Sequence, residues 1–169
     1  FTFPQITEET SFMVCIHQIV YPLTIAYNQS GGQVNCDQSG VIPCGSDAHF
    51  QIEPADCYEI TDVLLNGNSV LSQLNWQGNI AHFEITDCHH SANFQVIFAE
   101  EYYRVNVAWV DGADTLQSLS SLEHCGASYA FVSHYSDDCY DIDTMLVNGV
   151  SVSWDSLQVF NDIRTDISV

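Results

Sequence analysis

Short runs in which apolar residues occupy every second position recur along the chain, and turn-forming residues separate them. Phe94, Val96 and Phe98 form one such run, and this alternation places the three side chains on one face of a β-strand. Asn66-Gly67 and Asn148-Gly149 each lie between β-rich runs, where Asn-Gly supplies the positive φ angles of a type I′ hairpin. No segment carries a sustained helical stripe. The pattern therefore predicts an all-β fold with no substantial helix.

The same landmarks occur twice in the same order, at an offset of 81 or 82 residues. Self-similarity of this kind indicates a chain built from tandem structural repeats. Residues 116–122, with leucines three apart, align with a loop of the first copy, so we interpret them as loop or at most one helical turn. The matched segments are Cys44-Gly45 and Cys125-Gly126, Cys57-Tyr58-Glu59-Ile60 and Cys139-Tyr140-Asp141-Ile142, and Leu65-Asn66-Gly67 and Val147-Asn148-Gly149.

This repeat divides the chain into small β-sandwich or β-grasp-like modules. We expect residues 1–21 to be the closing strands of a preceding partial module with its linker. Residues 22–102 are then the first full module, and residues 103–169 are a second module cut short at its last strand.

Both ends of the chain fall inside the repeat. Phe12, Val14 and Ile16 correspond to the strand at residues 94–98 at an offset of 82, and residues 167–169 match the start of that strand. An exposed apolar strand invites aggregation, so something is expected to cover the segment around Val14. Either the preceding module of a longer array does so, or an incomplete module of another chain accepts the strand. The second arrangement predicts end-to-end contacts that propagate as filaments.

Four of the seven cysteines recur in register. Cys44 and Cys57 reappear as Cys125 and Cys139, so we predict one disulfide inside each copy, Cys44–Cys57 and Cys125–Cys139. A closed loop of this size stabilises a module by roughly 3 kcal/mol through the entropy of the unfolded chain. Buried thiols or a metal site are the alternatives, although a metal site favours closer spacing. Disulfides in turn predict an oxidising compartment.

The remaining three cysteines have no counterpart in the second copy. Cys36 and Cys88 occur only in the first copy and form a possible third disulfide. Cys15 is then left over, either buried as a thiol or bonded to another chain.

The charge balance excludes some partners. The chain carries 22 acidic residues and only two cations, Arg104 and Arg164, for a net charge of −20. Binding of nucleic acid or of anionic membrane surfaces requires Lys and Arg, so neither partner is expected. Most carboxylates must face solvent, where they keep the protein soluble or recruit divalent cations such as calcium between modules.

Two clusters offer metal-ligating side chains. Cys88, His89 and His90 suit zinc or copper, but neighbours on an extended segment point in opposite directions, and a polar turn with a disulfide is the favoured interpretation. Asp141 and Asp143 could hold calcium, but they lack the calcium-loop spacing and fit a solvated strand face. The motifs of nucleophilic, metallopeptidase and nucleotide-dependent catalysis are absent from the sequence, so we expect a protein that is not an enzyme and needs no cofactor.

The order of these motifs resembles the divergent internalin-type B-repeat modules of bacterial surface proteins. The residues that carry the resemblance are Phe50-Gln51-Ile52-Glu53-Pro54, the run from Tyr58 to Gly67, and a closing strand at residues 93–98. The second copy departs from the pattern, with Tyr135 in place of Pro54. The resemblance implies a non-catalytic repeat unit of an extracellular adhesin stalk or filament, with neighbouring copies of the same module as partners.

Two other functions stay open at this point. Trp76, Trp109 and Trp154 could form the face of a carbohydrate- or protein-binding module, provided that they gather on one exposed surface. The chain could also be an accessory segment of a larger secreted enzyme.

Overall fold

The computed structural model describes residues 13–133, 139–153 and 155–169. Within these ranges the regular structure is β-strand, apart from one turn of 3-10 helix, η1 (Leu71–Gln73). The all-β prediction is therefore confirmed.

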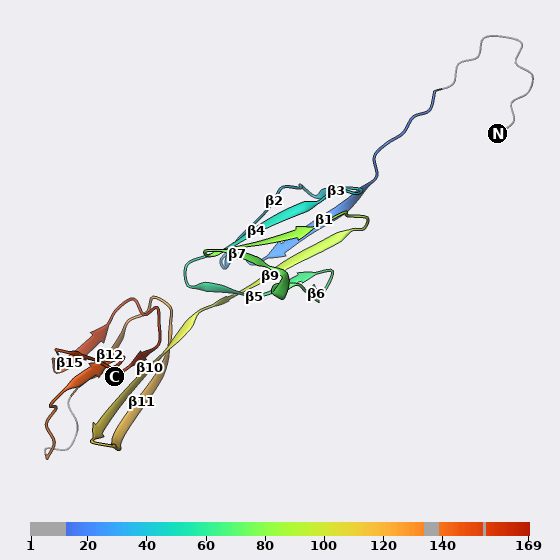
Figure 1. Cartoon of the computed structure of the whole chain (residues 1–169). Helices are drawn as coiled ribbons and strands as arrows, with labels where there is room; N and C mark the ends of the chain where they lie inside the picture. The colour runs from blue at the N-terminus through green and yellow to red at the C-terminus, as the bar shows by residue number, and fades with distance from the viewer. Residues whose placement is uncertain (1–12, 134–138, 154) are drawn as a thin grey trace, which may run out of the picture.

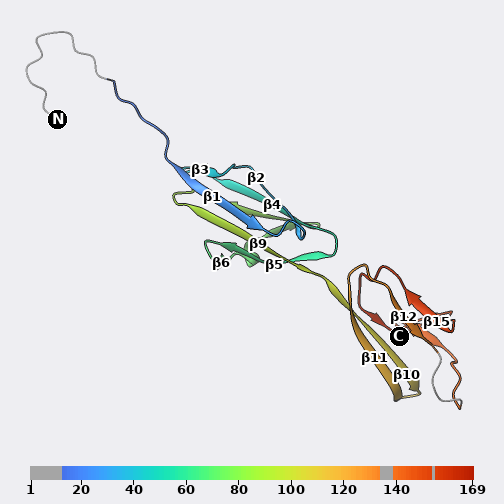
Figure 2. The same cartoon turned by 180° about the vertical axis from the view of Figure 1, so that it is seen from behind.

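The strands gather in two units that lie end to end (Figure 1), and Figure 2 shows the same arrangement from behind. We call residues 20–100 the N-terminal unit and residues 102–169 the C-terminal unit. Residues 13–19 lead away from the N-terminal unit at the end opposite the C-terminal unit.

The N-terminal unit is a two-layer sandwich. Its strands are β1 (Val20–Tyr27), β2 (Gly32–Cys36), β3 (Val41–Pro43), β4 (Ala48–Pro54), β5 (Tyr58–Leu65), β6 (Asn68–Ser69), β7 (Asn75–Gln77), β8 (Ile80–Ile85) and β9 (Ala92–Glu100). One sheet has the order β3-β1-β9-β5-β6 and the other the order β2-β4-β8-β7. β9 is the central strand, because it pairs in parallel with β1 and antiparallel with β5.

Alternating side chains build the core between these two sheets. Every second residue of β4 is buried, and Phe94, Val96 and Phe98 of β9 are buried as their alternation predicts. The rings of Phe50 and Phe94 stack at 4.0 Å between centroids, so the two sheets meet through aromatic side chains. At the edge, Asn66 and Gly67 both have positive φ angles between β5 and β6, which confirms the expected hairpin.

The C-terminal unit is assembled from smaller sheets. Its strands are β10 (Tyr102–Asp111), β11 (Asp114–His124), β12 (Tyr129–Val132), β13 (Met145–Val147), β14 (Val150–Val152), β15 (Leu157–Phe160) and β16 (Ile167–Ser168). β10 pairs antiparallel with β11 and in parallel with β16, while β12 pairs with β15 and β13 with β14. Asn148 and Gly149 have positive φ angles between β13 and β14, so the second expected hairpin is also confirmed.

The interpretation of residues 116–122 as a loop is wrong, because they lie within β11. β11 stays paired with β10 along its length, from Tyr102 opposite His124 to Asp111 opposite Asp114. In the N-terminal unit β3 pairs with β1 over only three residues, and the preceding β2 belongs to the other sheet. Gly32 permits that crossing, because a Cβ atom there would lie 2.5 Å from the carbonyl oxygen of Glu53.

The last strand lies two residues out of register with the sequence comparison. Asn66 in the first hairpin exchanges backbone and side-chain hydrogen bonds with Asn93, and Asn148 exchanges the same bonds with Ser168. Ser168 is therefore structurally equivalent to Asn93, and Val169 is equivalent to Phe94. The sequence comparison had instead matched Ile167 to Phe94. A register set by two-residue alternation alone cannot detect a shift of two, because it leaves every side chain on the same face.

Candidate functional site: the junction between the two units

A single residue, Glu101, connects β9 to β10, and turns from both units bind its backbone. The Glu101 N–H donates to the carbonyl oxygen of Cys57 at 2.9 Å, and its carbonyl oxygen accepts from the N–H of Cys125 at 2.9 Å. Cys57 lies between β4 and β5, and Cys125 lies between β11 and β12. The connection is therefore held on both sides by neighbouring turns.

A disulfide joins these two turns. Cys57 and Cys125 are bonded across 68 residues, with 5.3 Å between their Cα atoms. The predicted pairings Cys44–Cys57 and Cys125–Cys139 are therefore wrong. β4 separates Cys44 from Cys57, and its seven residues span roughly 23 Å in extended conformation, whereas bonded cysteines need Cα atoms within about 7 Å. The cross-link connects the units to each other, and it indicates an environment outside the reducing cytoplasm.

An ion pair reinforces the junction beside the disulfide. Arg164 donates two hydrogen bonds to the carboxylate of Asp56, at 2.6 and 3.0 Å, and a third to Asp162 at 2.9 Å. The hydrogen bonds from Arg164 lower the pKa of Asp56, and hydrogen bonding to Asp56 and Asp162 raises the pKa of Arg164. One of the two cations of the chain thus bridges the N-terminal and C-terminal units.

The far end of the N-terminal unit carries the counterparts of these groups. The N–H of Cys44 donates to the carbonyl oxygen of Ile19 at 2.9 Å, as that of Cys125 does to Glu101. Cys88 exchanges backbone hydrogen bonds with Gly45 and Ser46, as Ile163 does with Gly126 and Ala127. Cys44 in the N-terminal unit is therefore structurally equivalent to Cys125 in the C-terminal unit. No described unit is attached to the end of the N-terminal unit where Cys44 lies.

Cys44 contacts a histidine at this end. The Sγ atom of Cys44 lies 3.3 Å from Nδ1 of His89, and Nε2 of His89 lies 3.0 Å from Oδ1 of Asp87. The thiol and the imidazole lie within hydrogen-bond distance, and the carboxylate of Asp87 holds the ring in place. His89 and Asp87 correspond to Arg164 and Asp162 of the junction, which make the same contact in the C-terminal unit.

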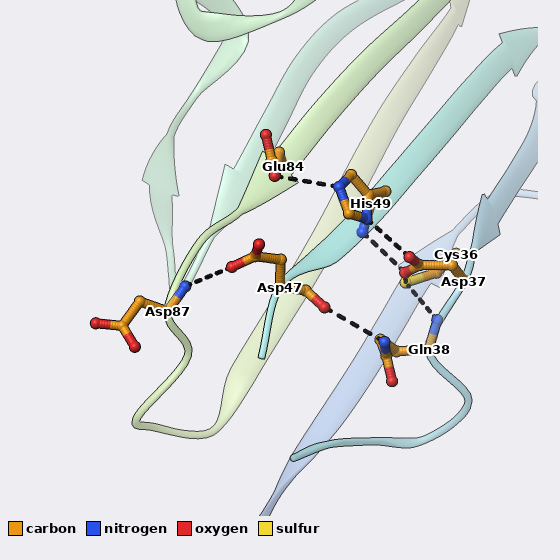
Figure 3. Close-up of polar contacts among 7 residues, drawn as sticks. All are labelled: Cys36, Asp37, Gln38, Asp47, His49, Glu84 and Asp87. Atoms are coloured by element: carbon orange, nitrogen blue, oxygen red, sulfur yellow. Dashed lines mark hydrogen bonds and ion pairs between the residues drawn. The ribbon is translucent and has the colours of Figure 1, made fainter. Parts of the chain in front are cut away.

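Acidic side chains surround a second histidine at the same end (Figure 3). His49 Nδ1 lies 2.8 Å from Asp37 Oδ2, and its Nε2 lies 3.1 Å from Glu84 Oε1. The backbone N–H of His49 also donates to Asp37, at 2.9 Å. These hydrogen bonds lower the pKa of Asp37, and hydrogen bonding to Asp37 raises the pKa of His49. Nearby, Asp47 accepts from the backbone N–H of Asp87 at 2.8 Å and fixes the turn that carries His89.

The third predicted disulfide, Cys36–Cys88, is also wrong. Cys36 ends β2, where its Sγ accepts from the backbone N–H of Gln38 and burial raises its pKa. Cys88 is buried in the adjacent turn and donates to the carbonyl oxygen of His90. Cys15 is exposed, so the alternative that it is buried is wrong as well.

The candidate metal ligands do not gather around one point. No group of three or more His, Cys, Asp and Glu side chains suited to a metal ion occurs in the part of the chain that the structure describes. Cys88 is buried, whereas the next two residues, His89 and His90, are exposed. Asp141 and Asp143 are exposed on a segment outside the strands.

The two described tryptophans lie in different units. Trp76 is exposed on β7, and Trp109 packs against Phe131 in the other unit while its indole N–H donates to the carbonyl oxygen of Ser133. Trp154 lies outside the described residues. Trp76 and Trp109 therefore do not gather on one exposed surface.

Sequence reasoning missed Arg164, Asp56 and Glu101. The usable signal was the scarcity of cations, because an arginine among 22 carboxylates is a natural partner for an acidic turn. Which carboxylate it meets depends on how the two units abut.

No family model matches the chain, and neither the curated proteins nor the solved structures contain a significant match. Among the described residues, no helix is long and apolar enough to cross a membrane.

Proposed function

We propose that the chain is a structural repeat unit of an extracellular surface array, such as an adhesin stalk or a filament, and that it is not an enzyme. The observation that carries this proposal is the junction, where the disulfide Cys57–Cys125 and the ion pair Arg164–Asp56 join successive units. The resemblance to internalin-type B-repeats supports the same role, with each unit as one copy of the repeat.

A rigid junction between the units is expected of a stalk more than of a binding protein with flexibly joined domains. Domains joined by small polar contacts ordinarily move relative to one another. Here the connection is one residue long, its backbone is hydrogen-bonded on both sides, and a covalent bond closes the gap between the units. Such a connection resists bending, which a stalk or filament requires to hold its shape under load.

The junction disulfide also supports an extracellular location. A disulfide at the junction survives where thiols are kept oxidised, as at cell surfaces. The net charge of −20 keeps a surface-rich array soluble and discourages binding to nucleic acid. The scattered tryptophans give the binding-module alternative no support.

Nuclear spin relaxation tests this role. In the oxidised chain, we expect the backbone amides of both units to report one common rotational diffusion tensor. In Cys57→Ser/Cys125→Ser the two units should reorient separately, while Cys44→Ser, which leaves the junction intact, serves as the matched control. Independent tumbling of the units in the oxidised wild-type chain would contradict a stiff structural unit.

A further inference from the structure

The C-terminal unit has a long edge strand. β11 pairs with β10 on one side and has no strand partner on its other side in the described part of the chain. It is 11 residues long, and Figures 1 and 2 both show it along the outside of the unit. β16 lies on the opposite side of β10, so the free edge of β11 does not depend on the last strand. The unpaired backbone N–H and C=O groups of such an edge can bind another strand.

The side chains of β11 do little to protect this edge. Proteins usually guard edge strands with charged side chains, proline or a short length. Residues 115–122 carry no charged side chain, although the chain contains 22 acidic residues. Leu119 and Leu122 are 41% and 58% exposed. The bulge of the hairpin lies near its tip, between Trp109 and Val110, so most of the strand is regular.

The outer strands of the N-terminal unit differ from β11 in length. β3 has three residues and ends at Pro43, which has no backbone N–H to donate. β6, β7 and β2 have two, three and five residues. Among the described strands, the long uncharged edge is therefore a property of the C-terminal unit.

The sequence of β11 is nearly symmetric about its central residue, Leu119. Leu116 and Leu122 lie three residues before and after it, and Ser118 and Ser120 flank it directly. In a two-fold interface the same patch of both copies must match itself. An antiparallel pair of β11 strands centred on Leu119 meets this requirement, because leucine then lies opposite leucine and serine opposite serine.

The charged residues at the ends of β11 fit the same register. With Leu119 on the axis, Asp114 of one copy lies opposite His124 of the other, so a carboxylate faces an imidazole. Glu123 lies opposite the uncharged Thr115. A shift of one residue would instead oppose Asp114 and Glu123, and opposed like charges destabilise a strand pair. The register centred on Leu119 therefore avoids repulsion within a chain of net charge −20.

We propose that β11 pairs antiparallel with β11 of a second copy of this chain, with Leu119 of both copies on a two-fold axis. Leu116 of each copy lies opposite Leu122 of the other, and the β16-β10-β11 sheets of the two copies become continuous. Main-chain hydrogen bonds hold the strands together, and the leucine pairs fix the register. Because the interface is two-fold, association stops at the dimer.

This surface is separate from the junction between the units, so the inference goes beyond the proposed function. In an array of repeat units, the same contact would join neighbouring stalks or filaments side by side. The dimer should persist in Cys57→Ser/Cys125→Ser, which releases the junction. Failure of the dimer and failure of the stiff junction are therefore distinguishable.

Association in solution is the first test. Sedimentation equilibrium of the oxidised 169-residue chain should show a monomer–dimer equilibrium. Because each copy carries a net charge of −20, sodium chloride should screen the repulsion between copies and tighten the dimer. A chain that stays monomeric at millimolar concentration in high salt, or one that grows beyond the dimer, would overturn the proposal.

A charge exchange at position 119 tests the two-fold axis. Leu119→Lys and Leu119→Glu each replace a leucine pair with two like charges, so each variant alone should dimerise roughly tenfold more weakly. An equimolar mixture of the two should form a heterodimer, because opposite charges then meet. Val110→Lys, which charges an exposed apolar residue of β10 away from the edge, is the matched control and should dimerise as the wild type does.

The charge exchange distinguishes loss of the contact from loss of the fold. The amide spectrum of each variant shows whether the monomer is folded, and heterodimer formation requires that both are. A mixture that stays monomeric while both variants are folded would refute pairing about Leu119. Equal weakening by Val110→Lys would show that the contact lies elsewhere on the hairpin.

Contacts between copies give the register directly. In a mixture of isotope-labelled and unlabelled chains, nuclear Overhauser effects should join the methyl groups of Leu116 in one copy to those of Leu122 in the other. Leu119 should contact its own counterpart. Contacts between copies that involve only residues outside β11 would overturn the proposal.

Discussion

The two units differ in the strand that runs parallel to β1 or β10 and in the size of their buried cores. Among the described residues, sixteen form the buried cluster of the N-terminal unit and five form that of the C-terminal unit. In the first unit β9 pairs with β1 over Ala92–Val96 on one side and with β5 over Phe94–Glu100 on the other. In the second, β16 covers only Ile167–Ser168. A central strand therefore determines how much of a small sandwich can be buried.

The two units also differ in the segments beside this strand. β5 extends over Tyr58–Leu65 because β9 supplies hydrogen-bonding partners for it. The corresponding segment of the C-terminal unit forms a strand only at Met145–Val147, where β14 pairs with it. Residues 141–144 carry a similar sequence but lie outside the strands. Strand formation here depends on the neighbour more than on intrinsic preference.

Core truncations should separate the two units most clearly. Phe50 is 1% exposed and stacks on Phe94, so Phe50→Ala should destabilise the N-terminal unit by about 3–5 kcal/mol. Phe131 occupies the corresponding place but lines a cavity of about 710 Å³ between β10, β12 and β13, so Phe131→Ala should cost its unit about 2 kcal/mol, because fewer contacts are lost. Urea unfolding followed by amide resonances of each unit measures both. An equal or larger loss for Phe131→Ala would contradict the difference in packing.

Loss of the junction disulfide should come next. The bond closes a loop of 68 residues, and chain entropy assigns such a loop about 4 kcal/mol of stabilisation. Cys57→Ser/Cys125→Ser should therefore lower the melting temperature, with the larger drop in the C-terminal unit because its own core is small. Cys44→Ser, which removes no disulfide of the single chain, is the control. Unchanged melting of the double variant in scanning calorimetry would show that the bond does not contribute.

Local patterns in the sequence predicted strands and hairpins well. The alternation at Phe94, Val96 and Phe98 and the two Asn-Gly turns depend on neighbours in the chain, and the structure places them as expected. The disulfide pairing could not be predicted from such local patterns. Cys57 and Cys125 meet only because Glu101 joins two units end to end, and pairing by repetition assigned each cysteine to its own copy.

The candidate sites show the same limit. Cys44, His89 and Asp87 form one contact, but 45 residues separate the cysteine from the histidine and neither carries a motif. Residues 116–122 resemble a loop of the first copy in position, yet their pairing with β10 makes them a strand. Long-range pairing, which one sequence does not reveal, decided both outcomes.

Hydrogen exchange should detect the difference in strand pairing between β5 and residues 141–144 without any substitution. The amides of β5 that pair with β9 should exchange slowly, whereas those of residues 141–144 should exchange roughly tenfold faster or more, because they lie outside the strands. Slow exchange at residues 141–144 would contradict the difference in strand pairing between the two segments.

The smallest expected effect is a pH dependence confined to the N-terminal unit. Its cross-strand pair His49–Glu84 corresponds to Ala130–Val159 in the C-terminal unit, which does not titrate. Hydrogen bonding to Asp37 raises the pKa of His49 above its ordinary 6.5, so the stability that His49 contributes is complete below pH 6.5 and is lost as pH rises through the raised value. The pKa of Asp37 is lowered from 3.8, so its contribution is complete above pH 3.8 and is lost as pH falls through the lowered value. The pair should therefore stabilise the N-terminal unit most between these two values.

Proton NMR titration of the imidazole measures this directly. The pKa of His49 should exceed 6.5 in the wild-type chain and should fall in Asp37→Asn, which removes the negative charge but keeps the shape of the side chain. His89→Ala, in the neighbouring turn, is the control and should leave the His49 titration unchanged. Because both side chains of the pair are exposed, added salt should reduce the shift. A His49 pKa at or below 6.5 in the wild-type chain would show that Asp37 does not hold the imidazolium.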